Sequence, residues 1–197
     1  MDGPVPWADP YSGRAGTVHL GGDAAAIARQ ERAVAAGNPG GAPFVLVVDP
    51  AVTDPSREVR GRRPVWAYAH VPNGDTRDPV ELVRRRIEEY APGFGDTVIA
   101  ARGRSAAAFE AYNPNYVGGD IAAGALTLRQ SLARPTPRPD PYGTPLPGVY
   151  LCSAATPPGP SVHGMCGYLA ALAALRRHHG VRKAPDLSPS PAKEPTA

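Results

Sequence analysis

Apolar and polar residues follow a strand-like pattern at several places in the first half of the chain. Residues 43–50 form a continuous β-branched run, and residues 63–72 alternate apolar and polar positions and add aromatics. Both patterns predict strands. Residues 17–20 predict a short strand, and residues 95–105 predict a further one that ends in turn residues. We therefore expect this half of the chain to build a sheet.

Helical spacing follows two of these strands. Asp23 precedes a run of strong helix formers that stops at Gly37, which predicts an N-cap and a left-handed C-terminal residue. Asp78, Pro79 and Glu81 occupy the N-cap, N1 and N3 positions that a capping box requires. Apolar residues at helical spacing continue after this capping box, so a second helix is expected there.

Two more helices are expected, at residues 106–114, which end at a proline, and at residues 163–175, which are rich in alanine. The strands come as a block, without regular β-α-β alternation. This order favours an antiparallel or mixed sheet covered by helices on one face, an α/β fold of the α+β kind.

Proline and glycine are abundant, at 25 and 22 residues. Residues 1–16 show no period and predict an irregular lead-in, while the proline-dense residues 134–148 predict an extended connection. The prolines also match the spacing of SH3 or WW ligands, but they lead directly into an apolar run at 149–153 that predicts a strand. Residues 181–197 contain too few apolar side chains to order themselves, and we expect a disordered tail.

The charge pattern bears on possible partners. The net charge is +3 and the isoelectric point is about 9.0, but the basic residues form short clusters at a turn, on a helix face and at a helix end, which favours a solvated surface over a nucleic-acid site. No apolar run reaches the ~18 to 20 residues of a membrane span. Cys152 and Cys166 do not suggest a disulfide framework, so we expect a reducing, cytoplasmic compartment.

The first turn of the C-terminal helix is a candidate ligand site. Its leading N–H groups lack internal partners and favour an anion or a polarised carbonyl, and Gly164 and Gly167 allow a flat ligand to approach. An ordinary strand-to-helix connection explains the same glycines. His163 and Cys166 have no second pair at zinc spacing, so no metal site is expected, and Cys166 lacks a neighbouring base, which favours buried packing.

Two further candidates come from the sheet half. His70 follows a predicted strand and suits either acid–base chemistry or a hydrogen-bonded strand end. Asn113, Asn115 and Asp120 surround two glycines, which suits either a loop bonded to its own backbone or a loop that faces a substrate. The residues leave both alternatives open.

Several motifs in order resemble one family of flavoproteins. The C-terminal motif is "TPLPGVYLCSAATPPGPSVHGMCGYLAALAAL", preceded by "NPNYVGGDIAAGALTLRQSLARP"; earlier pieces are "DGPVPW", "GTVHLGG", "PFVLVVDPAVTDPSR", "WAYAHVPNGD" and "EEYAPGF". Together they resemble the C-terminal part of FAD-dependent oxidoreductases related to phytoene desaturase, the carotenoid and retinoid oxidoreductases. The nearest branch is that of pyridine nucleotide-disulfide oxidoreductase domain-containing protein 2, and the match covers about residues 2–178.

The resemblance implies a partial two-domain flavoprotein. A substrate domain with a mixed or antiparallel sheet would occupy residues 17–133, and residues 134–180 would return as the final strand and helix of a Rossmann-like FAD domain. The positions that would meet the flavin are Ser153, Ala154, Gly159, Ser161, Val162, His163, Gly164 and Met165. His70 and Asn115 are substrate-side candidates for a catalytic role, and the substrate would be an apolar organic molecule.

The sequence departs from this family in its cofactor-binding and redox motifs. It contains no G-x-G-x-x-G motif, which holds the FAD pyrophosphate in family members, and it has Pro160 where members commonly have glycine. It also has no C-x-x-x-x-C pair, so disulfide reduction is not implied. We therefore expect the C-terminal portion of a dehydrogenase or desaturase that transfers hydride to flavin, inactive by itself. The alternatives are a non-catalytic interaction fragment, a remnant of an enzyme, or half of a split flavoprotein completed by an N-terminal FAD-domain polypeptide.

Overall fold

The computed structural model describes residues 1–38 and 40–188. Residues 181–188 contain no helix or strand, and the rest of the predicted disordered tail lies outside the described residues. The chain divides into two units, Met1–Ile121 and Ala122–Ala197. The domain boundaries that the resemblance implies remain predictions. Among the described residues, no helix is both long enough and apolar enough to cross a membrane.

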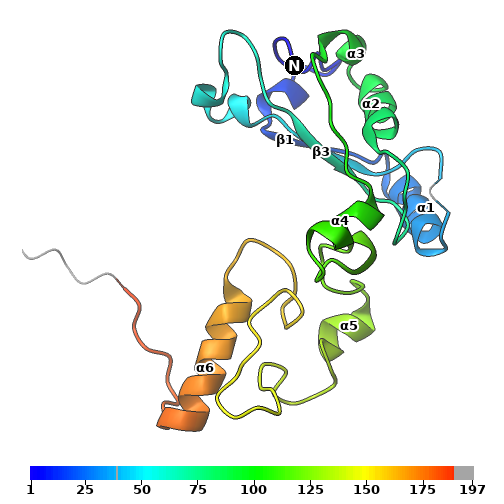
Figure 1. Ribbon diagram of the computed structural model, residues 1–197. Helices are drawn as coiled ribbons and strands as arrows, with labels where there is room; N and C mark the ends of the chain where they lie inside the picture. Colours follow the sequence, from blue (N-terminus) through cyan, green and yellow to red (C-terminus); the bar gives the residue numbers. More distant parts are fainter. Residues whose placement is uncertain (39, 189–197) are drawn as a thin grey trace, which may run out of the picture. The chain divides into compact units, whose positions relative to one another are not determined.

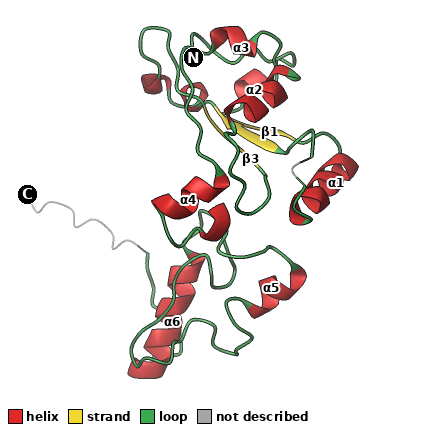
Figure 2. Ribbon diagram, turned by 45° about the vertical axis from the view of Figure 1, so that its right-hand side comes forward, coloured by secondary structure: helices red, strands yellow, loops and turns green. Residues whose placement is uncertain are grey.

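A three-stranded antiparallel sheet forms the centre of the first unit (Figure 1). Its strands are β1 (Thr17–Leu20), β2 (Val45–Val48) and β3 (Trp66–Ala69), in the order β1-β2-β3. Three predicted strands and the mixed α/β class are thus confirmed. Figure 2 shows that helices and long loops make up most of the remaining chain.

One face of the sheet is buried under the next two helices. Val45 and Val47 alternate along β2 and are both buried, together with Ile87 of α2 (Val80–Glu88) and Phe94 of α3 (Phe94–Thr97). Figures 1 and 2 both show α2 and α3 on the same side of the sheet. The irregular lead-in adds Val5 to this core, so it is part of the packed unit.

The helix caps follow the sequence with one correction. In α1 (Ala24–Ala35), Asp23 accepts the N–H of Ala26 at 2.6 Å, as predicted, and Gly37 has the left-handed φ of 79°. The predicted capping box of α2 is wrong. Pro79, which has no side-chain donor or acceptor, takes the N-cap position, and Asp78 accepts the N–H of Val80 at 2.9 Å from one residue further out.

The strand predicted at residues 95–105 is wrong. Glu88 accepts the N–H of Gly93 at 2.6 Å and that of Gly95 at 2.8 Å. These bonds curl the chain into α3, so the segment does not begin extended, and residues 98–105 join no sheet in the described structure. The next helix, α4 (Ala106–Tyr112), agrees with the prediction and is capped by Ser105.

The second unit contains two helices among its described residues, α5 (Leu128–Ala133) and α6 (Met165–His179). The apolar run at 149–153 predicted a strand, which the resemblance assigned to the FAD domain. This stretch instead forms only an isolated bridge, Gly143 with Tyr150, because its pairing with the preceding segment does not extend beyond this position. The predicted strand is therefore wrong. The sequence did not predict α5, which begins where Thr127 accepts the N–H of Gln130 at 3.2 Å.

Short 3-10 helices complete the described elements: η1 (Ser12–Arg14), η2 (Pro50–Val52), η3 (Pro55–Arg57) and η4 (Val117–Gly119).

Candidate functional site

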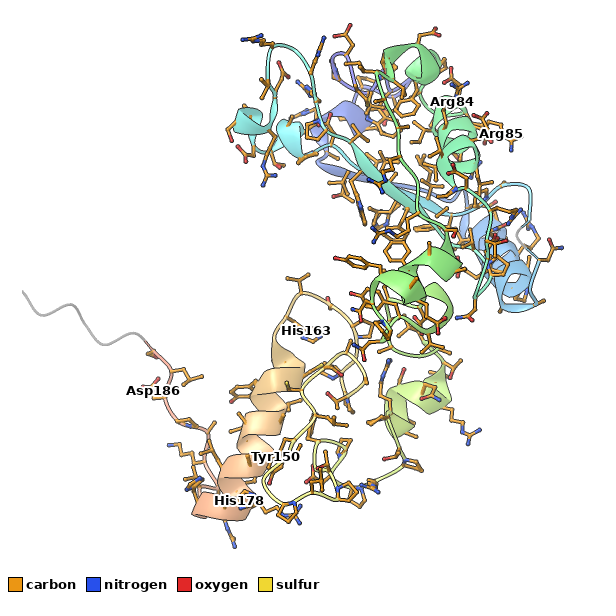
Figure 3. All side chains as sticks on the ribbon, in the orientation of Figure 1. Arg84, Arg85, Tyr150, His163, His178 and Asp186 are labelled. Atoms are coloured by element: carbon orange, nitrogen blue, oxygen red, sulfur yellow. The ribbon has the colours of Figure 1, made fainter. Side chains whose placement is uncertain are left out.

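The start of α6 is exposed, with most of the predicted flavin-facing residues around it. Ser161, Val162, His163, Gly164 and Met165 are all exposed, and Val162 makes almost no contact with the rest of the chain. Figure 3 shows His163 beside the first turn of α6. The helix has 15 residues, long enough for its N-terminal N–H groups to carry a partial positive charge.

The preceding loop is folded by its own hydrogen bonds. Ser153 accepts from Thr156 through its carbonyl, at 2.9 Å from the amide and 2.8 Å from the hydroxyl, and its Oγ accepts the N–H of Ala155 at 3.1 Å. The amide of Gly159 donates to the carbonyl of Thr156 at 2.9 Å. Ser153 is exposed and Ala154 half-buried, whereas Thr156 and Gly159 are buried. Gly159 therefore shapes the loop rather than presenting a surface to a ligand.

Cys166 ties the loop to the helix. It is buried, and its thiol lies 3.5 Å from the carbonyl oxygens of both Thr156 and Gly159. The prediction that Cys166 packs in the interior is confirmed. A thiol held between two carbonyls donates a weak hydrogen bond, and this contact fixes where the loop meets the first turn of α6.

His163 occupies part of the helix start itself. Its Nδ1 accepts the N–H of Met165 at 2.9 Å, so Nδ1 carries no proton in this arrangement. The N-cap residue Gly164 has no side chain, and the imidazole takes over the capping role from one residue earlier. A ligand at this helix start therefore meets an imidazole edge as well as backbone N–H groups.

Arg134 is the residue near this loop that the sequence did not reveal. It is only 3% exposed, and its Nη2 donates to the carbonyls of Ala122 at 2.9 Å and Ala123 at 3.1 Å. Nη1 lies 3.2 Å from the place where a Cβ on Gly159 would stand. Nε is buried and makes no hydrogen bond within the described part of the chain. An arginine before a proline gives no signal of burial, so sequence patterns could not have found it.

His70, the first substrate-side candidate, lies in the first unit next to β3. Its Nδ1 is 2.7 Å from a carboxylate oxygen of Glu31, on α1. Its ring stacks on Tyr68 at 5.7 Å between centroids and tilts against Phe44 at 4.8 Å. Glu31 lies 39 positions from His70 in the sequence. Only a search of the predicted helix α1 for a carboxylate partner to a lone histidine would have suggested this contact.

Asn115, the second candidate, bonds within its own loop. Its amide and side-chain nitrogens both donate to Asn113 Oδ1, at 3.1 and 3.0 Å. Two residues outside this loop hold the turn that follows it. Glu110 accepts the N–H of Gly118 at 2.9 Å, and Asn73 donates to the Val117 carbonyl at 2.9 Å. These bonds favour the loop's structural role over a substrate contact.

Two surface cavities of about 90 and 370 Å³ lie among the described residues of the second unit. Residues 144–150 line the smaller one with the end of α6, where Figure 3 shows Tyr150 near His178, and residues 139–142 line the larger one. None of the predicted flavin-facing residues lines either cavity. Across the described residues, no cluster of three or more His, Cys, Asp or Glu side chains suits a metal ion.

The chain matches no family model, no curated protein and no solved structure. Its functional assignment therefore depends on the sequence motifs and on the geometry of these residues.

Proposed function

We propose that the chain supplies the flavin-facing loop and the substrate-side sheet of an FAD-dependent oxidoreductase of the phytoene desaturase-related kind. A segment that carries the G-x-G-x-x-G motif would complete the enzyme. The observation that carries this proposal is the exposed start of α6, with residues 161–165 around it. The first turn of a helix favours a polarised carbonyl or negative charge, which a flavin pyrimidine edge presents when it is reduced.

The residues around this helix start fit such a group in two respects. Positive potential comes from the N-terminus of α6 and from the buried Arg134, whose Nε has no hydrogen-bond partner in the described structure. Gly164 and the fully exposed Val162 leave room at the surface. Gly159 does not fit a direct contact, since it is buried against Arg134.

Each group would have a distinct part in the reaction. FAD, when bound, would supply the acceptor for a hydride from a C–H bond of the substrate. The chain would orient the flavin ring through residues 161–165 and stabilise negative charge at the start of α6. His163 Nδ1 holds the amide proton of Met165 until a ligand takes its place.

Exposed leucines favour the alternative in which a partner polypeptide completes the protein. Leu128 and Leu132 lie one helical turn apart on α5 and are 88% and 89% exposed. Large apolar side chains at that exposure are typical of surfaces that another chain covers. This alternative is compatible with the flavoprotein proposal when the partner is the FAD-domain polypeptide.

Co-expression tests the proposal. The full chain is produced alone and together with an upstream-encoded polypeptide that contains G-x-G-x-x-G, and bound FAD is measured after gel filtration. We expect flavin to be retained only by the pair. Absence of flavin from the co-expressed pair contradicts the proposal, and stoichiometric FAD on the isolated chain contradicts the need for a partner.

A bulky substitution tests the location of the site. Val162→Trp places an indole where the flavin would lie, and we expect it to weaken FAD retention by about tenfold or more, equivalent to ~1.4 kcal/mol. Leu146→Trp, at another exposed position of the same unit, is the matched control. Equal effects of the two variants would show that residues 161–165 do not contact the flavin.

A further inference from the structure

Five rings make a continuous row of contacts in the first unit. His19 meets Phe44 at 5.5 Å between centroids, Phe44 meets His70 at 4.8 Å, His70 meets Tyr68 at 5.7 Å, and Tyr68 meets Trp66 at 5.4 Å. The Tyr68 and His70 rings are nearly parallel, at 13°. We call these five residues the ring row.

The ring row lies on the face of the sheet opposite the core. Along β3, Ala67 and Ala69 pack against the buried cluster, and Trp66, Tyr68 and His70 alternate with them. Successive side chains of a strand point to opposite faces, so the rings occupy the other face. Trp66 is 57% exposed, a large apolar surface that the packing of the first unit does not require.

Helix α1 brings a carboxylate to one end of the row. Gly21 lacks a Cβ, and a methyl group there would stand 2.7 Å from Ile27 and 3.0 Å from Phe44, so this glycine lets the helix approach the row. Glu31 follows Ile27 by four residues and therefore lies on the same side of α1. From there it reaches His70 Nδ1 at 2.7 Å.

This contact gives the other nitrogen of His70 a defined role. A carboxylate accepts the Nδ1 proton, so Nε2 of the neutral ring is an acceptor. The His70 side chain is 37% exposed, and Nε2 makes no hydrogen bond among the described residues. A hydrogen bond that only held α1 on the sheet would explain the Glu31 contact, but not why a partly exposed histidine lies in one row with the exposed Trp66 ring.

We propose that the ring row binds a planar, conjugated small molecule that carries an N–H or O–H donor at its edge. The plane stacks on the half-buried Tyr68 ring and meets the exposed Trp66 ring edge to face, since those two rings are T-shaped at 67°. The donor bonds to His70 Nε2, which Glu31 orients. That this molecule is the substrate rests on the proposed flavoprotein function, whereas its binding needs no flavin.

Three matched probes test separately whether binding needs the flat ring system and whether it needs the hydrogen-bond donor. 2-Naphthol has the plane and the donor, 2-methoxynaphthalene has the plane without the donor, and decahydro-2-naphthol has the donor without the plane. The full chain contains two tryptophans. Their ¹⁵N-labelled indole N–H signals report on the ring row through Trp66 and on the core cluster through Trp7, which packs against it. Trp66→Phe assigns the two signals.

We expect 2-naphthol to shift the Trp66 signal in a saturable way and to leave Trp7 unchanged. Loss of the donor weakens binding by about three- to tenfold, the usual range for one net hydrogen bond. Decahydro-2-naphthol gives no saturable shift. Absence of a saturable shift with 2-naphthol, or equal affinities of the two naphthalenes, overturns the proposal.

Substitutions separate the acceptor from the stacking surface. His70→Phe keeps a ring but removes the acceptor, so both naphthalenes should bind it equally well. Tyr68→Leu weakens both, and Tyr11→Leu, at an exposed tyrosine outside the row, weakens neither. If His70→Phe does not fold, the probe series on the unaltered chain still decides. Because no flavin is present, failure here is distinct from failure of the co-expression experiment.

Discussion

The two units of the chain bury apolar and polar side chains in different proportions. The first unit has an apolar cluster around the sheet, formed by Val5, Leu20, Val45, Val47, Ile87, Ala91 and Phe94. The first unit also buries the polar side chains of Asp49 and Arg86. Among the described residues of the second unit, the buried side chains are those of Cys166 and Ala170 of α6 together with the polar Arg134 and Thr156. One unit is stabilised chiefly by removal of apolar surface from water, and the other by hydrogen bonds to a few buried polar groups.

This difference has a consequence for the proposed site. The loop before α6 keeps its shape through Thr156, Gly159 and Cys166, each of which makes a specific contact. A buried polar contact costs more to break than its net contribution suggests, because the remaining group stays unsatisfied. Single substitutions in this loop should therefore change local structure, whereas those in the sheet unit should change overall stability.

The largest expected effect is on the apolar core. Ile87→Ala removes a side chain that is 1% exposed, and we expect it to lower the free energy of unfolding of the first unit by about 2 to 5 kcal/mol. Ile99→Ala is the matched control, since Ile99 is 52% exposed and such positions change stability by about 0.5 kcal/mol or less. Urea denaturation followed by circular dichroism measures both. Similar losses for the two variants would contradict the assignment of the core.

Next in size is the effect of a methyl group in the loop. Gly159 has a φ of 102° and faces Arg134 Nη1 at 3.2 Å from its Cβ position, so Gly159→Ala should destabilise the second unit by about 1 to 3 kcal/mol. Gly167→Ala lies inside α6 with open space around it and should stabilise the helix by about 0.5 to 1 kcal/mol. Hydrogen exchange of α6 measures both effects. If the two substitutions changed the stability of the second unit in the same direction, this account of the loop would be refuted.

A smaller effect should appear in acid, in the first unit. The amides of Gly95 and Gly93 donate to Glu88 and hold its pKa below the ordinary 4.5. A lowered folded-state pKa contributes stability that is present above 4.5 and lost as the pH falls through the lowered value. Glu88→Gln should flatten this acid limb in denaturation measured across pH. Glu81→Gln, which removes only exposed ion pairs on the same helix, should leave the limb in place.

The smallest effect should appear in alkali, in the second unit. Burial, with the nearby Cys166 and Asp140, raises the pKa of Tyr142 above 10.0. A raised folded-state pKa contributes stability that is present below 10.0 and lost as the pH rises through the raised value. Tyr142→Phe should remove this loss, as measured by hydrogen exchange of the second unit, while Tyr168→Phe retains it. An unchanged alkaline response in Tyr142→Phe would mean that another group titrates.

Local patterns predicted the elements whose signals are contained in a few neighbouring residues. β2 and β3 follow from β-branched and alternating positions, and Asp23 marks the start of α1. The strands predicted at 95–105 and 149–153 failed because a strand also needs a neighbour, and periodicity says nothing about whether one exists.

The candidate sites show the same division. The exposed start of α6 could be predicted from its glycines and its alanine-rich helix, since caps are local. Neither the Glu31 contact with His70 nor the burial of Arg134 could be predicted, because each depends on how distant segments meet. The lead-in likewise has no periodic pattern, yet Val5 lies in the core.

The His163 imidazole accepts the N–H of Met165 and so occupies the position that the acceptor atom of a ligand would take. A carbonyl that binds the first amide of α6 must displace Nδ1, so one acceptor is exchanged for another and little net free energy is gained from that bond. The relative affinities of different ligands would then depend on shape complementarity at the neighbouring surface and on the hydrogen bonds that the displaced imidazole forms with water. Under the proposed function, this exchange would favour a flat molecule over a lone anion, which adds no contact area to compensate for the lost hydrogen bond.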